Sequence, residues 1–419
     1  MEISLLTIIS LFISYVTIYG VVYFIYVYLK RDSEPEATLF HPDVSMIIPA
    51  HNEAANISSC IKSLLSQDYD GKIEIIVLDD GSTDGTRKIV SKYASVRFIQ
   101  SSKPGRAVGK TITVNKGVLL AKHELVGVLD ADSYLDVNAI KNMVRHFESP
   151  VIGAVVPIVK VHNPRNLIEK MQMIEYTLSM CVRKIVSNTG ALFMTHGVGT
   201  IFRKSALKKV GLFEAKTLTE DLNIGLKLIK AGYKLASSFN AVGYTVVPST
   251  AKHVIKQRLR WNGGLFENSY WFRDIFFNKD YGNLGLFVLP INLFWSGVTV
   301  YIALMGVRDL LKDFYRDLRN LFITNFDFNY FLSGKIDSLM TFRVNELTII
   351  SMISVFMFIS FYLMMNKQLR IGVKESLVSY LVLPFYFSVF FVINSIATII
   401  TPLYLAKRGG RPWLTDKTN

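Results

Sequence analysis

The stretch IEIIVLDDGS, residues 73–82, is an apolar, β-branched run that ends in two adjacent carboxylates and a glycine. Such a run, bounded by turn residues, predicts a buried β-strand over Ile73–Leu78. Asp79 and Asp80 then stand directly at the carboxyl end of that strand. Adjacent acids before a glycine form an ordinary turn more often than a site, so the surrounding chain decides their meaning.

Strand and helix patterns alternate around this stretch, in a block that runs from about residue 42 to residue 241. Val44–Pro49 and Leu125–Leu129 are predicted as strands, and Ala54–Ser66 and Thr86–Tyr93 as helices. This alternation predicts a largely parallel sheet with helices on both faces. Ligands of such sheets bind outside the carboxyl ends of the strands, which is where the polar clusters fall.

The second cluster is Asp130-Ala131-Asp132-Ser133, which follows the strand Leu125–Leu129 directly. Two acids spaced by one residue can hold a hard cation through oxygen ligands. Nucleotide sugars need such a cation, because the leaving diphosphate develops charge as the glycosidic bond breaks. Asp-x-Asp alone is a weak signal. Together with Asp79-Asp80 at a matching strand end, it indicates nucleotide-sugar chemistry.

A third acidic group, Thr219-Glu220-Asp221, opens an amphipathic helix predicted over Leu222–Ala231. One explanation is capping, with Thr219 as the cap and the acids stabilised by the helix dipole. A second is catalysis, because an inverting sugar transfer needs a carboxylate to take the proton of the attacking acceptor hydroxyl. The two explanations are compatible, and Asp221 is the candidate base.

The segment Gln257-Arg258-Leu259-Arg260-Trp261 has two interpretations. By composition alone it is a basic helix lying at a membrane surface. The functional interpretation assigns Arg260 to a diphosphate, which a guanidinium binds as a fork, with Gln257 hydrogen-bonding nearby. Trp261 would then offer a flat apolar face to a sugar ring.

Half of the residues are hydrophobic and the mean hydropathy is +0.31, which is typical of membrane proteins. Ser4–Leu29 carries no charge and is predicted as a retained transmembrane helix. The aromatic and basic stretch Lys256–Phe277 and the amphipathic stretch Leu310–Phe322 are expected to lie in the headgroup plane. Further spans are predicted over Leu286–Val307, Leu347–Met365 and Leu377–Leu405.

The charge distribution gives an orientation. Lys30 and Arg31 follow the first span, which places the α/β block in the cytoplasm. Three simple later spans would leave the basic tail outside, against the tendency of basic residues to stay in the cytoplasm. One more crossing would resolve this, either through a break of the last span at Pro384 or through a re-entrant segment within residues 309–345. The net charge of +14 suits anionic lipids and phosphorylated donors; with the spans, it argues against nucleic acid as a partner.

Taken in order, these motifs resemble the processive, membrane-bound inverting glycosyltransferases of family 2, which include poly-N-acetylglucosamine, hyaluronan, cellulose and chitin synthases. The likeness is greatest to the poly-N-acetylglucosamine synthases, through Gln257–Gly264 (QRLRWNGG), Gly199–Lys204 and the tail Lys407–Gly410 with Trp413. The shared pieces are Ile48–Glu53, Asp79–Ser82, Gly109-Lys110 with Asn115, Asp130–Asp132, Thr219–Asp221 and Gln257–Trp261.

The resemblance implies an α/β GT-A (Rossmann-like) catalytic domain inserted between transmembrane helices, with amphipathic interface helices and with Mg²⁺ or Mn²⁺ as cofactor. We therefore expect a transmembrane helix at 1–30, a cytosolic GT-A domain at 31–241, interface helices at 242–285, a transmembrane region with an interfacial helix at 286–405, and a basic tail at 406–419.

Site roles follow from the resemblance by position. Asp221 would be the catalytic base with Glu220 beside it, and Asp132 would bind the metal together with Asp130. The residues expected on the nucleotide-sugar donor are Glu53, Asp79, Asp80, Lys110, Asp130, Gln257 and Arg260. Those expected on the acceptor are Trp261 and His196.

Two histidines need comment. His51 stands where many relatives carry a tyrosine that packs on uracil, and a neutral histidine in this loop is expected to pack similarly. His196 either faces the acceptor or satisfies a backbone carbonyl, which is the commoner role.

The predicted function is repeated transfer from a UDP-sugar, UDP-N-acetylglucosamine above all, to a β-linked polysaccharide that the spans help to translocate. Single transfer to a membrane lipid, such as a polyprenyl phosphate or a glycolipid, is the alternative. A noncatalytic transporter or receptor is the third class, against which the complete carboxylate sets argue. The expected partners are the donor, the growing glycan or lipid acceptor and membrane lipids, with an accessory membrane subunit left open, in a multi-pass protein of the plasma membrane.

Overall fold

The computed structural model describes residues 39–328 and 373–408, together with 34–36 and single positions within 11–22 and 352–366. Most of the predicted spans Ser4–Leu29 and Leu347–Met365, and the tail from residue 409 onward, lie outside the described residues. The chain forms two compact units. One comprises residues 32–293 with 372–419, and the other residues 1–31 with 294–371.

The first half of the central sheet is parallel, as the sequence predicts. Its strands are β1 (Val44–Ala50), β2 (Ile73–Asp80), β3 (Val96–Ser102) and β4 (Leu125–Leu129), in the order β3-β2-β1-β4. Most side chains of β1, β2 and β4 are buried on both faces, which explains their continuous apolar runs. The two acids that end β2 are therefore carried to the sheet's carboxyl edge.

The second half of the sheet is mixed, so the prediction of a largely parallel sheet holds for the first half alone. β7 (Val198–Arg203) runs antiparallel to β4 and to β6 (Ile152–Val161). β8 (Lys234–Thr245) is parallel to β6, and β5 (Ser133–Leu135) pairs antiparallel with β8. A strand's residue pattern reflects its burial and not its direction, so the reversal at β7 leaves no mark in the sequence.

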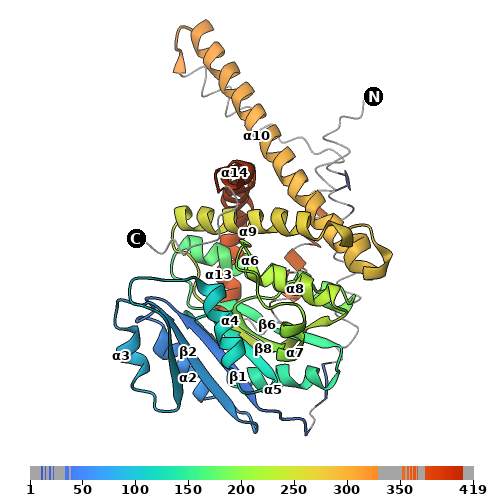
Figure 1. Cartoon of the computed structure of the whole chain (residues 1–419). Helices are drawn as coiled ribbons and strands as arrows, with labels where there is room; N and C mark the ends of the chain where they lie inside the picture. The colour runs from blue at the N-terminus through green and yellow to red at the C-terminus, as the bar shows by residue number, and fades with distance from the viewer. Residues whose placement is uncertain are drawn as a thin grey trace. The chain divides into compact units, whose positions relative to one another are not determined.

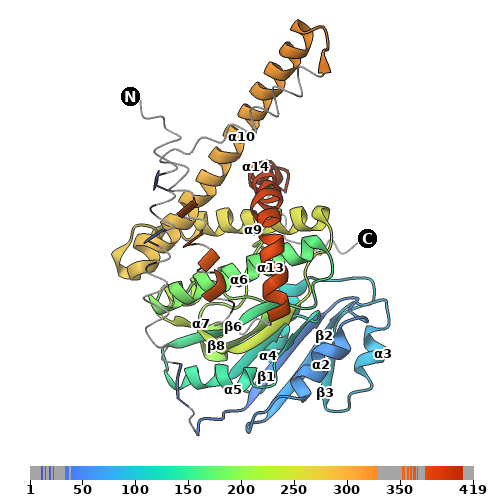
Figure 2. The same ribbon diagram turned by 180° about the vertical axis from the view of Figure 1, so that it is seen from behind.

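Helices cover both faces of this sheet (Figures 1 and 2). Along β1, Met46 and Ile48 pack with the helices of one face, whereas Ile47 packs with those of the other, as alternation along a strand requires. On the first face lie α2 (Ile57–Leu65), α3 (Thr86–Val90) and α5 (Ala139–Val144). On the second face lie α4 (Lys110–Leu120), α7 (Lys204–Lys209) and α8 (Glu220–Lys230).

Two long helices lie beyond the carboxyl edge of the sheet. α6 (Leu167–Asn188) begins with a capping box between Asn166 and Glu169. α9 (Ala251–Trp271) is capped by Thr250, whose hydroxyl accepts from His253 N–H. The carboxyl-terminal helices pack on them, α13 on α6 and α14 on α9. These two helices are α13 (Val373–Phe385) and α14 (Phe391–Arg408). The remaining short helical turns are Arg145–Glu148, Arg273–Ile275, Lys279–Tyr281, Leu284–Val288 and Tyr386–Phe390.

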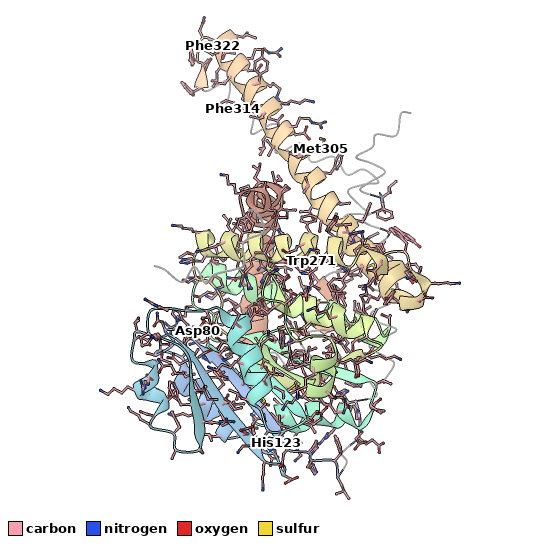
Figure 3. All side chains as sticks on the ribbon, in the orientation of Figure 1. Asp80, His123, Trp271, Met305, Phe314 and Phe322 are labelled. Carbon is pink, nitrogen blue, oxygen red and sulfur yellow. The ribbon has the colours of Figure 1, made fainter. Side chains whose placement is uncertain are left out.

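One helix in the described part of the chain is long and apolar enough to cross a membrane. It covers Leu284–Ile323 with a mean hydropathy of 1.7, and its α-helical part is α10 (Leu289–Ile323). At about 1.5 Å per residue α10 is about 50 Å long, well over the ~30 Å of a hydrocarbon core. The predicted span and the predicted interfacial helix thus form one continuous helix, on which Phe314 and Phe322 are exposed (Figure 3).

The predicted span Leu377–Leu405 is not one regular helix. α13 ends at Phe385, directly after Pro384, and a π-helical turn at Tyr386–Phe390 separates it from α14. The irregularity falls beside the proline that the sequence marks as a point of interruption, because proline removes a hydrogen-bond donor from a helix.

Candidate active site

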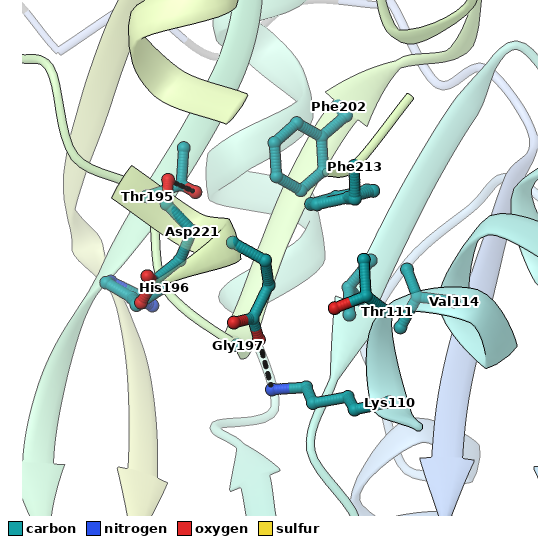
Figure 4. Close-up of a pocket in the computed structure, with 11 residues that line it drawn as sticks. Lys110, Thr111, Val114, Thr195, His196, Gly197, Phe202, Phe213 and Asp221 are labelled. Carbon is teal, nitrogen blue, oxygen red and sulfur yellow. Dashed lines mark hydrogen bonds and ion pairs between the residues drawn. The ribbon is translucent and has the colours of Figure 1, made fainter. Parts of the chain in front are cut away.

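Three segments that are far apart in sequence meet at Lys110, the first residue of α4. Its Nζ lies 2.6 Å from Asp130 Oδ1, at the end of β4, and 3.3 Å from Glu220 Oε1, at the start of α8. Figure 4 marks the pair with Glu220 by a dashed line. The second and third acidic clusters of the sequence therefore converge on one ammonium group.

The charges in this cluster stabilise one another. Burial alone would lower the pKa of Lys110, but Asp130 and Glu220 raise it above its ordinary value. Burial would raise the pKa of Glu220, whereas Lys110 and Arg260 hold it below its ordinary value. Both groups are therefore charged at neutral pH, and Arg260 brings the positive charge of α9 to the same place.

Asp221 differs from its neighbour. Burial and the charge of Glu220 raise its pKa, and Arg260 and Lys110 offset this only in part. Its Oδ1 accepts from Leu222 N–H at 2.9 Å, and its main-chain carbonyl accepts from Thr195 Oγ1 at 2.8 Å. A carboxylate whose pKa is raised is a stronger proton acceptor once ionised, so Asp221 is the more basic of the adjacent pair.

Asp221 also lies between two hollows. A cavity of about 330 Å³ is large enough for a sugar ring. A smaller pocket of about 20 Å³ (Figure 4) includes Lys110 and Glu220. Asp221, Thr195 and His196 line both the smaller pocket and the larger cavity. The larger cavity is lined by Val159, Glu175, Tyr176, Ser179, Met180, Arg183, Phe193, Met194, Thr195, His196, Val198, Thr219, Asp221, Leu222, Trp261, Asn262, Leu265 and Asn292.

Arg258 is a residue whose role the sequence does not reveal. Its side chain is 4% exposed and forms an ion pair with Glu175 of α6. The guanidinium also lies 4.2 Å from the centroid of the Trp261 ring and 5.5 Å from that of Phe390. Arg258 thus holds two residues of the cavity wall, Glu175 and Trp261, in place. Composition suggests a base at a membrane surface, whereas the structure buries Arg258 inside the protein.

The first acidic cluster, Asp79-Asp80, lines neither the cavity nor the smaller pocket, and Asp80 instead binds the backbone that precedes Lys110. Asp80 Oδ1 accepts from Ser102 Oγ and from Val108 N–H, both at 2.9 Å, and its Oδ2 accepts from Gly109 N–H at 2.8 Å. Because Gly109 directly precedes Lys110, Asp80 fixes the start of α4. Asp80 lies at the end of the sheet opposite His123 (Figure 3).

Glu53 and the Asp-x-Asp carboxylates lie around one buried thiol. Burial raises the pKa of Cys60, and Asp132, Asp130 and Glu53 raise it further. Glu53 Oε2 accepts from Asn56 Nδ2 at 3.0 Å. Asp132 Oδ1 accepts from Ser133 Oγ at 3.2 Å. The Glu53 loop and the end of β4 are therefore neighbours. Asp79, which directly precedes Asp80, is 3% exposed, and its Oδ1 accepts from Ser82 N–H at 3.3 Å.

The two histidines have defined partners. His51 Nδ1 donates to the carbonyl of Asp80 at 2.6 Å. His196 Nε2 donates to the carbonyl of Pro157 at 3.0 Å, while burial and then Arg183 lower its pKa to about 3. His196 is thus a neutral residue that satisfies a backbone carbonyl, which is one of the two alternatives drawn from the sequence. It also lines the cavity, and its contact with an acceptor stays a prediction.

Asp130 and Asp132 supply hard oxygen ligands, the type that Mg²⁺ and Mn²⁺ prefer. Within the described residues no third Asp, Glu, His or Cys joins them as a ligand group. Mg²⁺ is often held by one or two carboxylates plus substrate phosphates. This pair fits an ion whose shell a diphosphate completes.

Gln257, the remaining donor-side candidate, lies on α9 one turn before Trp261. Its Oε1 is buried and has no hydrogen-bond partner within the described part of the chain. That oxygen accepts hydrogen bonds, so it suits a hydroxyl or N–H group, whereas the amide nitrogen suits a phosphate oxygen.

Comparison with known proteins finds one family and several relatives that this chain matches. The model of the family "Glycosyl transferase family 2" matches residues 45–211. A poly-beta-1,6-N-acetyl-D-glucosamine synthase of Staphylococcus epidermidis is 32% identical over 263 residues, 62% of this chain and 63% of that protein. The synthase of Staphylococcus aureus strain COL is 29% identical over 300 residues, 70% and 72% of the two chains. The first match thus spans less than two thirds of that relative.

A solved structure of similar fold is a mannosyltransferase of Pyrobaculum calidifontis in complex with GDP-Man and Mn²⁺. Its TM-score is 0.54 at 18% identity, and the match covers 89% of this chain and 97% of that one. This likeness concerns the fold alone, a GT-A-like α/β domain. Residues 45–211 thus match glycosyltransferase family 2, the family that the order of the sequence motifs predicts.

Proposed function

We propose that this protein is a membrane-bound inverting glycosyltransferase that extends a β-linked polysaccharide from a UDP-sugar donor. The observation that carries the proposal is the meeting of Lys110, Asp130 and Glu220 beside Asp221, at the wall of a cavity that Trp261 also lines. The family 2 domain supports the reaction class. The names of the relatives support N-acetylglucosamine as the sugar.

Asp221 is the base in this proposal. Its carboxylate takes the proton of an acceptor hydroxyl, whose oxygen attacks the anomeric carbon from the face opposite the UDP oxygen. The new glycosidic bond forms as the bond to the diphosphate breaks, and the electron pair leaves with UDP. Glu220 is held ionised by Lys110 and Arg260; its role is to keep those cations in place.

The leaving group is stabilised by positive charge. Lys110 and Arg260 supply this charge from the protein. A Mg²⁺ or Mn²⁺ ion held by Asp130 and Asp132 would neutralise the diphosphate. Asp80, which fixes the start of α4, keeps Lys110 in reach, and Glu53, Asp79 and Gln257 complete the donor side.

The acceptor sugar occupies the larger cavity in this proposal. The Trp261 ring offers an apolar face to the sugar, and Arg258 behind it fixes that ring. Glu175, Arg183 and His196 supply polar groups around it. A growing glycan would place its terminal sugar in this cavity at every round of transfer, whereas a lipid acceptor that receives a single sugar would use the cavity once.

α10 supports membrane attachment, because it is long and apolar enough to span. We extend this to a multi-pass protein of the plasma membrane with the family 2 domain in the cytoplasm, where UDP-sugars are made available to it. Translocation of the product by the spans belongs to the same proposal.

The test is a donor screen on the purified full chain in detergent with Mg²⁺ or Mn²⁺, measuring UDP release from several UDP-sugars and sizing the labelled product. We expect UDP release to be fastest from UDP-N-acetylglucosamine and the product to be a polymer. A single sugar on an extractable lipid would replace the polymerase by the lipid-transfer alternative. Absence of UDP release from every donor would refute the proposal.

A further inference from the structure

Helix α9 continues past Trp261 to two polar residues that belong to none of the recognised motifs, Glu267 and Asn268. Glu267 Oε2 accepts from Thr217 Oγ1 at 2.9 Å and from Leu218 N–H at 2.8 Å. These two partners directly precede Thr219-Glu220-Asp221. The carboxylate of Glu267 thus binds α9 to the segment that delivers the base.

Asn268 makes a second connection at the same place. It is fully buried, and its Nδ2 lies 3.1 Å from Thr217 Oγ1, 3.2 Å from Thr219 Oγ1 and 2.8 Å from the carbonyl of Gly264. Its Oδ1 accepts from Asn223 Nδ2 at 2.8 Å. One amide therefore contacts α9, the Thr219 segment and the first turn of α8.

At Thr219 the hydrogen bond to Asn268 takes the place of the capping hydrogen bond expected at the start of α8. It occupies the N-cap position of α8, but its side chain makes no capping hydrogen bond, although such a bond is typically worth about 1 kcal/mol. The hydroxyl accepts from Asn268 instead. The sequence predicts a capping threonine, and the structure uses that side chain to join two elements.

The backbone of α9 at Gly264 also lies directly against the side chain of Thr219. A Cβ placed on Gly264 would lie 2.2 Å from Thr219 Oγ1, so no side chain fits between α9 and Thr219. Because Arg260 and Gly264 are one turn apart on α9, the same contact fixes the backbone that carries Arg260 relative to Glu220 and Asp221.

We infer that Glu267 and Asn268 are positioning residues, which hold the base Asp221 at a fixed offset from Arg260 so that proton acceptor and diphosphate-side cation form one rigid unit. This inference rests on the proposed function. Displacement of a catalytic group by about 1 Å can lower a rate about 100-fold. Arg260 lowers the pKa of both carboxylates, and its influence weakens with distance.

The test has two parts, and the first does not depend on activity. Thermal unfolding is compared for Asn268→Leu, Thr219→Val and the double variant. If the two side chains interact, the double variant loses less stability than the two single losses added together. Simple additivity would overturn the connection itself.

The second part measures UDP affinity, kcat and the pH profile. We expect Asn268→Leu and Glu267→Ala to lower kcat at least 10-fold, to leave the Kd of UDP within about threefold, and to move the acid limb of kcat/KM to higher pH. Glu267→Gln keeps an acceptor oxygen and should restore most of kcat. Asn142→Leu on α5, which removes one hydrogen bond to the carbonyl of Asn240 on β8, is the matched control with normal kcat.

The outcomes separate the two claims. Normal kcat and a normal pH profile in Glu267→Ala would overturn the positioning role, even if Asn268→Leu failed to fold. The stability losses of the variants can be coupled while the wild-type chain turns over no nucleotide sugar. That result would overturn the proposed function and the positioning role, but the connection between α9 and Thr219 would stand.

Discussion

Replacing Arg258 by Met leaves the carboxylate of Glu175 in a buried site without its cation. The side chain of Glu175 is 22% exposed and that of Arg258 is 4% exposed, and breaking such a buried pair typically costs about 3–5 kcal/mol. This cost cannot exceed the free energy of protonating Glu175, because the neutral carboxyl no longer needs a cation. Protonating a glutamate of ordinary pKa, about 4.3, requires about 4 kcal/mol at pH 7 and about 1 kcal/mol at pH 5.

The sign of the pH dependence follows from Glu175. Burial raises its pKa, and Arg258 opposes this rise, so the variant raises the pKa further. A carboxyl whose folded pKa lies above its unfolded value destabilises the fold as pH rises between the two. We therefore expect the loss of stability in Arg258→Met to be several kcal/mol at pH 7 and to shrink by about 2–3 kcal/mol at pH 5.

Thermal and denaturant unfolding of the full chain in detergent, at both pH values, measures this loss. Adding Glu175→Gln to Arg258→Met removes the stranded charge and should recover most of the stability at pH 7. Lys141→Met, which breaks an exposed pair with Asp68, should change stability by less than about 1 kcal/mol. An equal loss at pH 5 and pH 7, with no recovery in the double variant, would refute the reasoning.

Three further predictions concern the donor side and the base. Asp80→Asn replaces an oxygen that accepts a backbone N–H by an amide nitrogen; we expect a loss of about 1–3 kcal/mol in thermal unfolding and a higher KM for the donor, and unchanged values would contradict the role of Asp80. Excess chelator should abolish transfer and added Mn²⁺ or Mg²⁺ should restore it; full activity in chelator would exclude the metal at Asp130 and Asp132. Because the pKa of Asp221 is raised, the acid limb of kcat/KM should lie above the ordinary aspartate value of about 3.9, with activity lost as pH falls through it; a limb at or below that value would contradict the assignment.

The sequence predicted what depends on local patterns. The strand before Asp79-Asp80 and the strand before Asp130 are apolar runs, because both sheet faces are covered. Strand ends in a parallel sheet share an edge, so the positions of Asp80 and Asp130 in the sequence predicted that both lie at that edge. There Asp80 accepts from Gly109 N–H, and Asp130 pairs with the adjacent Lys110. The Glu220-Asp221 pair joined them because α8 covers the same face as α4.

Long-range partners were not predictable. Nothing in the pattern QRLRW distinguishes the buried Arg258 from a solvent-exposed base, because the partner that buries it, Glu175, is on α6. Asn268 likewise sits on a helix without a distinctive local signal, and only the fold brings it to Thr219. The direction of β7 is set by tertiary pairing for the same reason.

The most direct test of the central claim is Asp221→Asn, which keeps the size of the side chain and removes its capacity to accept a proton. We expect kcat for UDP-sugar turnover to fall about 100-fold or more, with the Kd of UDP within about threefold, while the surface variant Asp68→Asn behaves as the unmodified chain. Turnover that survives in Asp221→Asn at the unmodified rate would contradict the account.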